Sequence, residues 1–306
     1  MNLREWALPV YTILMQLSVG SMAVLWILRT FYRSRFSDEQ IEDALRNPVA
    51  VIFITISMAM VGSFFHLSQW YISFMAIVNI NTSWLSREVF FTVLCWLAVT
   101  SLWYIQAHVD AHMRLKSLLG WLAVGFGLTA IFCMSNCYQL PSQAAWDTPF
   151  TYGFFYSSVI LLGISASITI LTMDLQLVSM QKPLKERVSP EIIRRSLPAL
   201  AIAAIILMLS VILQYHLLIQ RLSAGDLTAE TSVQLYTGLY QPLLIFRLAA
   251  GLSGVFWLAI AGLQVWRRKL PVVNLGRHAY MACLLIMVGE IVGRFLFYAT
   301  HVRIGI

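Results

Sequence analysis

Charged residues are scarce in this sequence. Asp, Glu, Lys and Arg make up 11% of its 306 residues and the mean hydropathy is +0.75, whereas soluble domains carry about 25% charged residues. This scarcity excludes a water-soluble protein. Lys and Arg number 21 against 14 Asp and Glu, which gives a net charge of +7. In a membrane protein such an excess of positive charge first indicates how the spans are oriented in the membrane. We therefore expect no nucleic acid partner.

Cysteine is also rare, and its spacing does not suit a metal. A CxxC pair is absent, which excludes a zinc ribbon or an iron–sulfur cluster of the chain's own, and burial in apolar runs speaks against a disulfide framework. His108, Asp110 and His112 have a spacing that could bind a metal, but they lie in a positively charged connection. We expect no metal site. The four cysteines are Cys95, Cys133, Cys137 and Cys283.

Long apolar runs are abundant. A bilayer core of about 30 Å needs about 20 apolar residues in a helix, and alternating ten-residue segments of a membrane barrel are absent. The sequence predicts an all-α membrane protein, an eight-transmembrane-helix bundle forming a single domain over 1–306. Pro48, Pro149, Pro198 and Pro242 fall at or just before run starts. The expected spans are 9–31, 48–67, 88–107, 116–136, 151–175, 197–219, 240–266 and 276–300.

The connections between these spans alternate in charge. The first, third, fifth and seventh hold most of the Lys and Arg, whereas the second holds only Arg87, the fourth none and the sixth only Arg221. The positive-inside rule then places both termini on the non-cytoplasmic side. Arg4 and Glu5 do not form a basic n-region, so we expect the first span to be retained rather than cleaved.

Polar side chains within the spans gather on one side of the membrane, in the half toward the outer face. Ionisable groups at membrane depth are costly and tend to mark function. Glu290, Arg294, Phe297 and His301 fall on one stripe of the last helix, and Gly289 and Gly293 beside it would let another helix approach. The full set is Gln16, His66, Glu88, Asn136, His216, Arg247, Glu290, Arg294 and His301.

Each of these residues also has a purely structural interpretation. Glu290 and Arg294 could form an internal ion pair or contact a ligand directly, and Arg247 could pair with Glu88 or with Glu290. Gln16 and Asn136 are typical of interhelical hydrogen bonding. What favours a functional set is the shared side of the membrane, because chance would scatter polar residues over both halves.

Three stretches carry a family resemblance: FFHLSQ at 64–69, WLSREVFF at 84–91 and GEIVGRFLFYATHVRIGI at 289–306, supported by 138–155 and by Gln16. They resemble the membrane anchor subunit of dimethyl sulfoxide reductase, the DmsC family. The resemblance covers the whole chain in span number, topology and spacing. Where relatives carry an Arg after the fourth span this chain has Asn136, so Arg87, Arg247 or Arg294 would have to supply that charge.

The resemblance implies an eight-helix anchor without haem in the bacterial inner (cytoplasmic) membrane, which oxidises menaquinol in anaerobic respiration. It implies an iron–sulfur partner subunit with [4Fe-4S] clusters and a catalytic partner with molybdopterin guanine dinucleotide, and no cofactor bound by this chain. The family's quinol-oxidising His and Glu match His66 and Glu88. A neutral imidazole and a carboxylate near the interface are suited to taking the two protons of a quinol.

Two other functions stay open. A haem b anchor would use two of His66, His216 and His301, although ligands at helix ends would leave the haem half exposed. A secondary transporter would place its site near the midplane and show inverted repeats, and neither feature is evident. Quinol-binding or supporting roles are expected for Gln16, Arg87, Asn136, Arg247, Glu290, Arg294 and His301. Trp70, Tyr71 and Trp84 could line the quinol ring, or simply belong to the interfacial belt.

Overall fold

The computed structural model describes residues 3–66, 78–109, 112–179 and 188–302, without the side chains of 3–6, 64–66 and 178–179. Within these ranges the chain is helical and contains no strand. The elements are α1 (Leu3–Tyr32), α2 (Asp38–His66), α3 (Trp84–His108), α4 (Met113–Asn136), α5 (Pro149–Ser179), α6 (Ser189–Ser223), α7 (Leu227–Gln234), the π-helical η3 (Leu235–Leu239), α8 (Gln241–Trp266), the 3₁₀ turn η4 (Val272–Leu275) and α9 (Gly276–Ala299).

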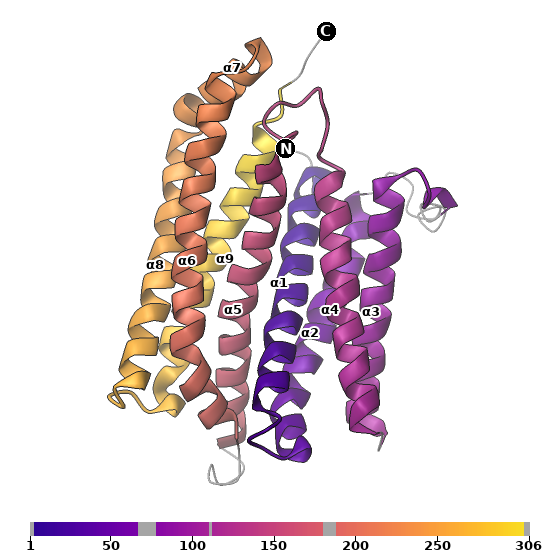
Figure 1. Cartoon of the computed structure of the whole chain (residues 1–306), viewed down its shortest axis with the longest axis vertical. Coiled ribbons are helices and arrows are strands. Elements are labelled where there is room, and N and C mark those ends of the chain that lie inside the picture. Colours follow the sequence, from indigo (N-terminus) through magenta and orange to yellow (C-terminus); the bar gives the residue numbers. More distant parts are fainter. Residues whose placement is uncertain (1–2, 67–77, 110–111, 180–187, 303–306) are drawn as a thin grey trace.

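Eight of the described helices are long and apolar enough to cross a membrane, which confirms the predicted bundle of eight spans. Figure 1 shows α1 and α5 at its centre, with α2, α3 and α4 on one side and α6, α8 and α9 on the other. The most apolar stretches of α1 and α5 are 72% and 83% buried, against 33–44% for the other spans. The two central helices therefore form the core, and the outer ones present apolar side chains to the surroundings.

A close contact between two glycines joins the two sides of the bundle. A Cβ atom on Gly20 of α1 would lie 2.0 Å from the carbonyl oxygen of Val159, and one on Gly163 of α5 would lie 2.3 Å from the backbone of Gly20. Helices in a membrane associate through such close backbone packing, because lipid gives no hydrophobic driving force between them. The α1–α5 seam fixes how the two sides meet.

Two helices, α2 and α6, begin eight or more residues earlier than predicted. α2 starts at Asp38 and α6 at Ser189, so Pro48 and Pro198 lie inside helices, although Pro149 and Pro242 do stand at helix starts. The expectation that Pro48 and Pro198 mark starts is therefore wrong. The extra turns are amphipathic, so a search for uniformly apolar runs misses them, and they are held by packing against the bundle. Ser37 and Gln40 cap α2 reciprocally, through bonds of 3.3 and 3.1 Å between side chain and backbone, as in a capping box.

The connection between α6 and α8 is not a bare loop. Asp226 caps α7 by accepting a hydrogen bond from the backbone N–H of Ala229 at 3.0 Å, and η3 continues it to Tyr240. Tyr236 of η3 is buried, with its hydroxyl 3.3 Å from that of Thr300 at the end of α9. Figure 1 shows α7 at the same end of the molecule as the start of α1 and the end of α9. Which side of the membrane this end faces stays a prediction from loop charge; we call it the α7 end.

Candidate functional site

The first buried carboxylate, Glu88, lies one turn into α3, close to the α7 end. Ser83 caps α3 by accepting from the backbone N–H of Ser86 at 3.4 Å, which sets the register of this first turn. Tyr11 of α1 donates its hydroxyl to Oε1 of Glu88 at 3.0 Å, and the Cys137 thiol donates to Oε2 at 3.6 Å. Both donors are neutral, and Glu88 is buried. The described surroundings thus satisfy this carboxyl group without a cation.

Two sets of hydroxyl groups lie in the neighbourhood of Glu88. The Tyr11 hydroxyl lies 3.3 Å from that of Thr92. The hydroxyls of Tyr138 and Tyr298 are 3.0 Å apart, and Tyr298 is 3.3 Å from the Thr12 hydroxyl one residue along α1. Such side chains both donate and accept, so neighbouring groups can pass a proton. Hydroxyl groups that can both donate and accept therefore surround Glu88 in the described structure.

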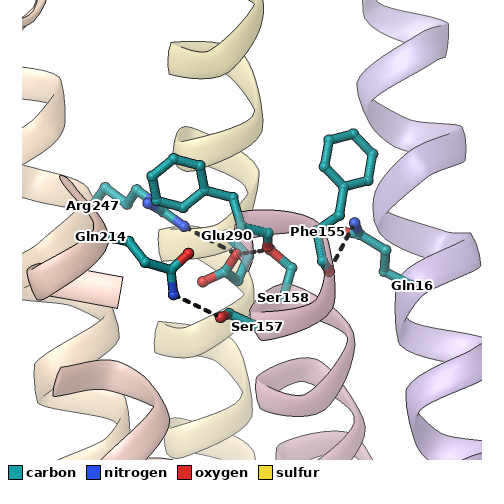
Figure 2. Close-up of polar contacts among 8 residues, drawn as sticks. Gln16, Phe155, Ser157, Ser158, Gln214, Arg247 and Glu290 are labelled. Carbon is teal, nitrogen blue, oxygen red and sulfur yellow. Dashed lines mark hydrogen bonds and ion pairs between the residues drawn. The ribbon is translucent and has the colours of Figure 1, made fainter. Parts of the chain in front are cut away.

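The second buried carboxylate, Glu290 of α9, is held differently. Figure 2 shows it reached by Ser158 of α5 and by Arg247 of α8. Ser158 donates its hydroxyl to Oε2, and Nη2 of Arg247 donates to the same oxygen at 3.4 Å. The sequence left open whether Arg247 pairs with Glu88 or with Glu290, and the structure places it on Glu290. All three side chains are buried.

Glycines on α9 let Arg247 reach this position. A Cβ on Gly293 would lie 2.0 Å from Nε of Arg247, and one on Gly289 would lie 3.1 Å from the Arg247 carbonyl oxygen and from the backbone N of Gly251. The expected close approach of a helix beside Gly289 and Gly293 is therefore confirmed, and the approaching helix is α8. Only a residue without a side chain leaves room for the guanidinium here.

Arg294 does not form the expected ion pair with Glu290 among the described contacts. Its guanidinium carbon instead lies 3.9 Å from the ring centroid of Phe155 and 5.7 Å from that of Phe297. Of the two interpretations that the sequence left open for Glu290 and Arg294, an internal ion pair between them is therefore not among the described contacts, because Arg247 contacts the carboxylate and Arg294 lies over aromatic rings of α5 and α9. Stacking over a ring face is favourable for a cation.

The candidate residues Gln16 and Asn136 act as hydrogen-bonding side chains between elements, as one of their two interpretations expected. Nε2 of Gln16 donates to the Phe155 carbonyl oxygen at 3.4 Å (Figure 2). Oδ1 of Asn136 accepts the Tyr152 hydroxyl at 2.9 Å, and Nδ2 donates to the Phe132 carbonyl. Gln16 joins α1 to α5, and Asn136 joins α4 to α5.

The described contacts of Arg87 are with backbone carbonyls and an aromatic ring, and not with either buried carboxylate. Its guanidinium donates to the backbone carbonyls of Ile80 at 2.8 Å and Asn81 at 2.7 Å, and it lies 4.3 Å from the Trp84 ring centroid. The structure thus gives it a role in fixing the turn before α3. Trp84 itself is exposed, as an interfacial side chain would be.

The histidine candidates lie at the periphery. His301 follows α9, is exposed, and has its ring 5.3 Å from that of Trp146; His216 on α6 is also exposed. α2 ends at His66, whose side chain lies outside the described residues, as do Trp70 and Tyr71. The structure therefore does not place the His66 imidazole relative to Glu88.

The described residues contain no group of three or more His, Cys, Asp or Glu side chains that could hold a metal. His108 and His112 are exposed and Asp110 lies outside the described part of the chain. The four cysteines are free thiols. Of these, Cys137 carries a contact that the sequence did not suggest, because spacing alone gave no reason to pair it with Glu88.

The residues that sequence reasoning missed are neutral hydroxyl groups and one thiol. An aromatic or small hydroxyl residue in an apolar span looks like ordinary membrane helix, so no local signal marks Tyr11 or Ser158. Tyr298 could have been found, because it continues the helical stripe one turn beyond Arg294. The missed residues that contact or line the two carboxylate sites are Tyr11, Cys137, Ser158, Tyr215 and Tyr236, and Thr92 and Tyr298 belong to the hydroxyl groups near Glu88.

Comparison with known proteins supplies the identity that the geometry leaves open. The chain is 26% identical over 313 residues to the anaerobic dimethyl sulfoxide reductase chain YnfH of Escherichia coli K12, covering 98% of this chain and 96% of that one. It is 22% identical over 304 residues to the C subunit of the anaerobic dimethyl sulfoxide reductase of Haemophilus influenzae, covering 99% and 97%. The family model of the DMSO reductase anchor subunit (DmsC) matches residues 1–300, and the chain belongs to this family of multi-pass membrane anchor subunits.

Proposed function

We propose that this chain anchors a dimethyl sulfoxide reductase-type complex in the bacterial inner membrane and oxidises menaquinol there. The proposal draws support from the family and from the names of the two relatives. The electrons of the quinol pass to an iron–sulfur subunit with [4Fe-4S] clusters, and from there to a catalytic subunit with molybdopterin guanine dinucleotide. The chain itself binds no redox cofactor in this proposal.

The observation that carries the site assignment is the environment of Glu88. Oxidation of a quinol to a quinone releases two protons and two electrons, so the site needs groups that accept protons and a route that takes electrons elsewhere. Glu88 is buried near one end of the bundle, and Tyr11 and Cys137 are its neutral donors. Neutral donors can rearrange when the carboxyl group takes a proton, whereas a guanidinium can only donate.

In the proposed mechanism His66 takes the proton of one quinol hydroxyl as a neutral imidazole, and Glu88 accepts the other and releases it to water. α2 ends at His66 and α3 begins just before Glu88, so both residues stand at the α7 end. Aromatic and aliphatic side chains would hold the ring and its isoprenoid tail. The two electrons leave the quinol for the cluster-bearing partner docked on that same face.

The loop charges support an outward-facing α7 end, with both termini away from the cytoplasm. A reporter fused after Ile306 that functions only outside the cytoplasm should be active. A reporter that works only in the cytoplasm would place Glu88 and the docking face on the opposite side.

The test of function is Glu88→Gln in the assembled complex. The change keeps the side-chain volume but removes the proton acceptor, and loss of a proton-transfer group costs about 100- to 10,000-fold in rate. We expect menaquinol oxidation to fall by that range, while reduction driven by a soluble artificial donor stays intact. The matched control is Glu230→Gln on exposed α7 at the same end, which should oxidise quinol normally.

Two results would refute the assignment. Quinol oxidation at the unmodified rate in Glu88→Gln would remove the carboxyl group from proton transfer. Omission of the whole chain that abolished the artificial-donor activity as well would point to a role in folding or maturation of the partners rather than in coupling them to quinol.

A further inference from the structure

The pocket around Glu290 carries more positive than negative charge. Phe154, Ser158, Tyr215, Tyr236, Arg247, Glu290, Gly293, Arg294 and Phe297 line it. Among these lining residues two are guanidinium groups and one is a carboxylate, so the formal charge is +1. Both arginines are buried, with exposed fractions of 3% and 4%. A buried surplus charge among membrane helices is costly unless something offsets it.

The donors of the two arginines are only partly used. Nε and Nη1 of Arg247 and Nε of Arg294 are buried and have no hydrogen-bond partner in the described structure. The Arg247 guanidinium lies 4.8 Å from the Tyr215 ring centroid, and that of Arg294 lies 3.9 Å from that of Phe155. Ring faces stabilise the cation, but they do not satisfy N–H groups that lie in the guanidinium plane. These N–H groups are therefore free to donate to an additional acceptor.

None of the hydrogen bonds among the described residues gives these three N–H groups an acceptor. Oε2 of Glu290 already accepts from Ser158 and from Arg247. The Tyr236 hydroxyl lies 3.3 Å from Thr300, and a phenol in any case brings no negative charge while it keeps its proton. An arginine does not lose its proton in proteins. The lining residues thus leave one positive charge without a compensating negative charge among them.

The room in the pocket limits what this group can be. The free space beside the lining side chains admits a group of about the size of one water molecule. A quinone ring or a lipid phosphodiester is far larger. A monatomic anion is the smallest group that carries the single compensating charge, and Arg guanidinium groups are common partners of anions.

We infer that Arg247 and Arg294 hold a small inorganic monoanion, of chloride size, as a structural counter-ion between α8 and α9. The anion completes the charge balance that Glu290 begins and receives the unused N–H groups of the two arginines. Its effect is to stabilise the packing of α5, α6, α8 and α9. This inference does not depend on the proposed quinol chemistry at Glu88.

The direct test uses the purified whole complex with bromide as the probe. Crystals grown in sodium bromide should show an anomalous difference peak within contact distance of both guanidinium groups. The thermal unfolding midpoint should also rise with sodium chloride or bromide but not with sodium gluconate at the same ionic strength, because a ligand that binds only the folded state stabilises it. A pocket without a bromide peak, or one occupied by lipid or quinone, overturns the inference.

Two variants should shift the halide effect in opposite directions. Arg294→Gln removes the surplus charge, so the halide-dependent rise of the midpoint should vanish. Glu290→Gln keeps the acceptor for Ser158 but doubles the surplus, and should tighten bromide binding by about tenfold, the effect of about 1.4 kcal/mol. Arg221→Gln, at the exposed end of α6, is the control and should keep the response of the unmodified complex. Equal halide responses in all four proteins would refute the site.

Discussion

Two buried carboxylates stand toward the α7 end of this bundle, and their neighbours differ in one respect. Glu88 is met by a phenol and a thiol, whereas Glu290 is met by a hydroxyl and a guanidinium. Neutral donors can serve a carboxyl group with or without its proton, whereas a guanidinium has only donors and so suits the ionised form. The first arrangement suits the proton exchange proposed for Glu88, and the second suits holding helices together.

The comparison teaches that depth in the membrane does not by itself define a functional site. Both carboxylates lie toward the α7 end of the bundle, and their shared half of the membrane is what grouped them in the sequence. Their partners come from different helices: Glu88 connects α3 with α1 and the end of α4, and Glu290 connects α9 with α5 and α8. The chemistry of the partners, not depth, separates the two.

The largest effect is expected for Glu290→Ala, which tests whether Glu290 has a structural role that differs from the role of Glu88. The change leaves Arg247 without its carboxylate partner, and stranding one member of a buried pair costs about 3 to 5 kcal/mol, a large part of the stability of a typical domain. We expect much less assembled complex in the membrane and a lower thermal unfolding midpoint. Immunodetection of the complex and a thermal melt measure the two effects.

The control for this change is Glu230→Ala, at an exposed position of α7, where assembly should be normal. Activity per assembled complex is the second readout. If Glu290→Ala complexes assemble fully but oxidise quinol slowly, Glu290 belongs with Glu88 in the chemistry and the division between the two sites is wrong.

The next change acts on the seam that joins the two sites. Gly163→Ala would place a Cβ 2.3 Å from the Gly20 backbone, and backbone cannot yield as a side-chain end can. Overpacking of this kind costs about 1 to 3 kcal/mol, so we expect a lower melting midpoint. Gly125→Ala on α4, where a Cβ would meet nothing within 4 Å, is the control and should be neutral or stabilising, because Ala favours helix. A stable Gly163→Ala protein would show that the seam is looser than described.

Much of the fold could be predicted, because a membrane helix must satisfy its own backbone hydrogen bonds and therefore reads as a long apolar run. What failed were the amphipathic ends. The turns before Pro48 and Pro198 mix polar and apolar residues, and their helical state depends on burial of Ile41 and Ile192 against the bundle. α7 and η3 also depend on contacts that are distant in the sequence, because Tyr236 packs near Thr300 of the last helix.

The site was predictable in its ionisable residues and not in its partners. Glu290 and Arg294 are four residues apart on one helix, so their spacing allowed them to pair. In the structure α8 packs beside Gly293, and this packing brings Arg247 of α8 into contact with the Glu290 carboxylate. A helix crossing cannot be read from spacing within a single helix. Tyr11 and Glu88 meet across 77 positions of sequence, which no motif records.

A smaller effect is expected where the neutral partner of Glu88 is removed. Tyr11→Phe deletes the hydroxyl that donates to Oε1 and keeps the ring. A hydrogen bond to a charged group contributes about 1.5 to 3 kcal/mol, so we expect quinol oxidation to slow by about 10- to 100-fold, with normal assembly. Tyr156→Phe is the matched control, because its hydroxyl donates to the Leu128 carbonyl, away from Glu88. Equal rates in the two variants would mean that Tyr11 does not position the carboxyl group.

The smallest effect is expected at Arg87, where an arginine lies next to Glu88 in the sequence but serves the backbone. Arg87→Lys keeps the positive charge and loses the fork that reaches the Ile80 and Asn81 carbonyls together, because an ammonium group is a point donor. We expect a loss of about 1 kcal/mol, seen as faster amide hydrogen exchange over residues 78–83, with an unchanged KM for quinol. A raised KM with unchanged hydrogen exchange would instead indicate that Arg87 contacts the quinol. The site at Glu88 would then include a positively charged side chain, which the described contacts show only at Glu290.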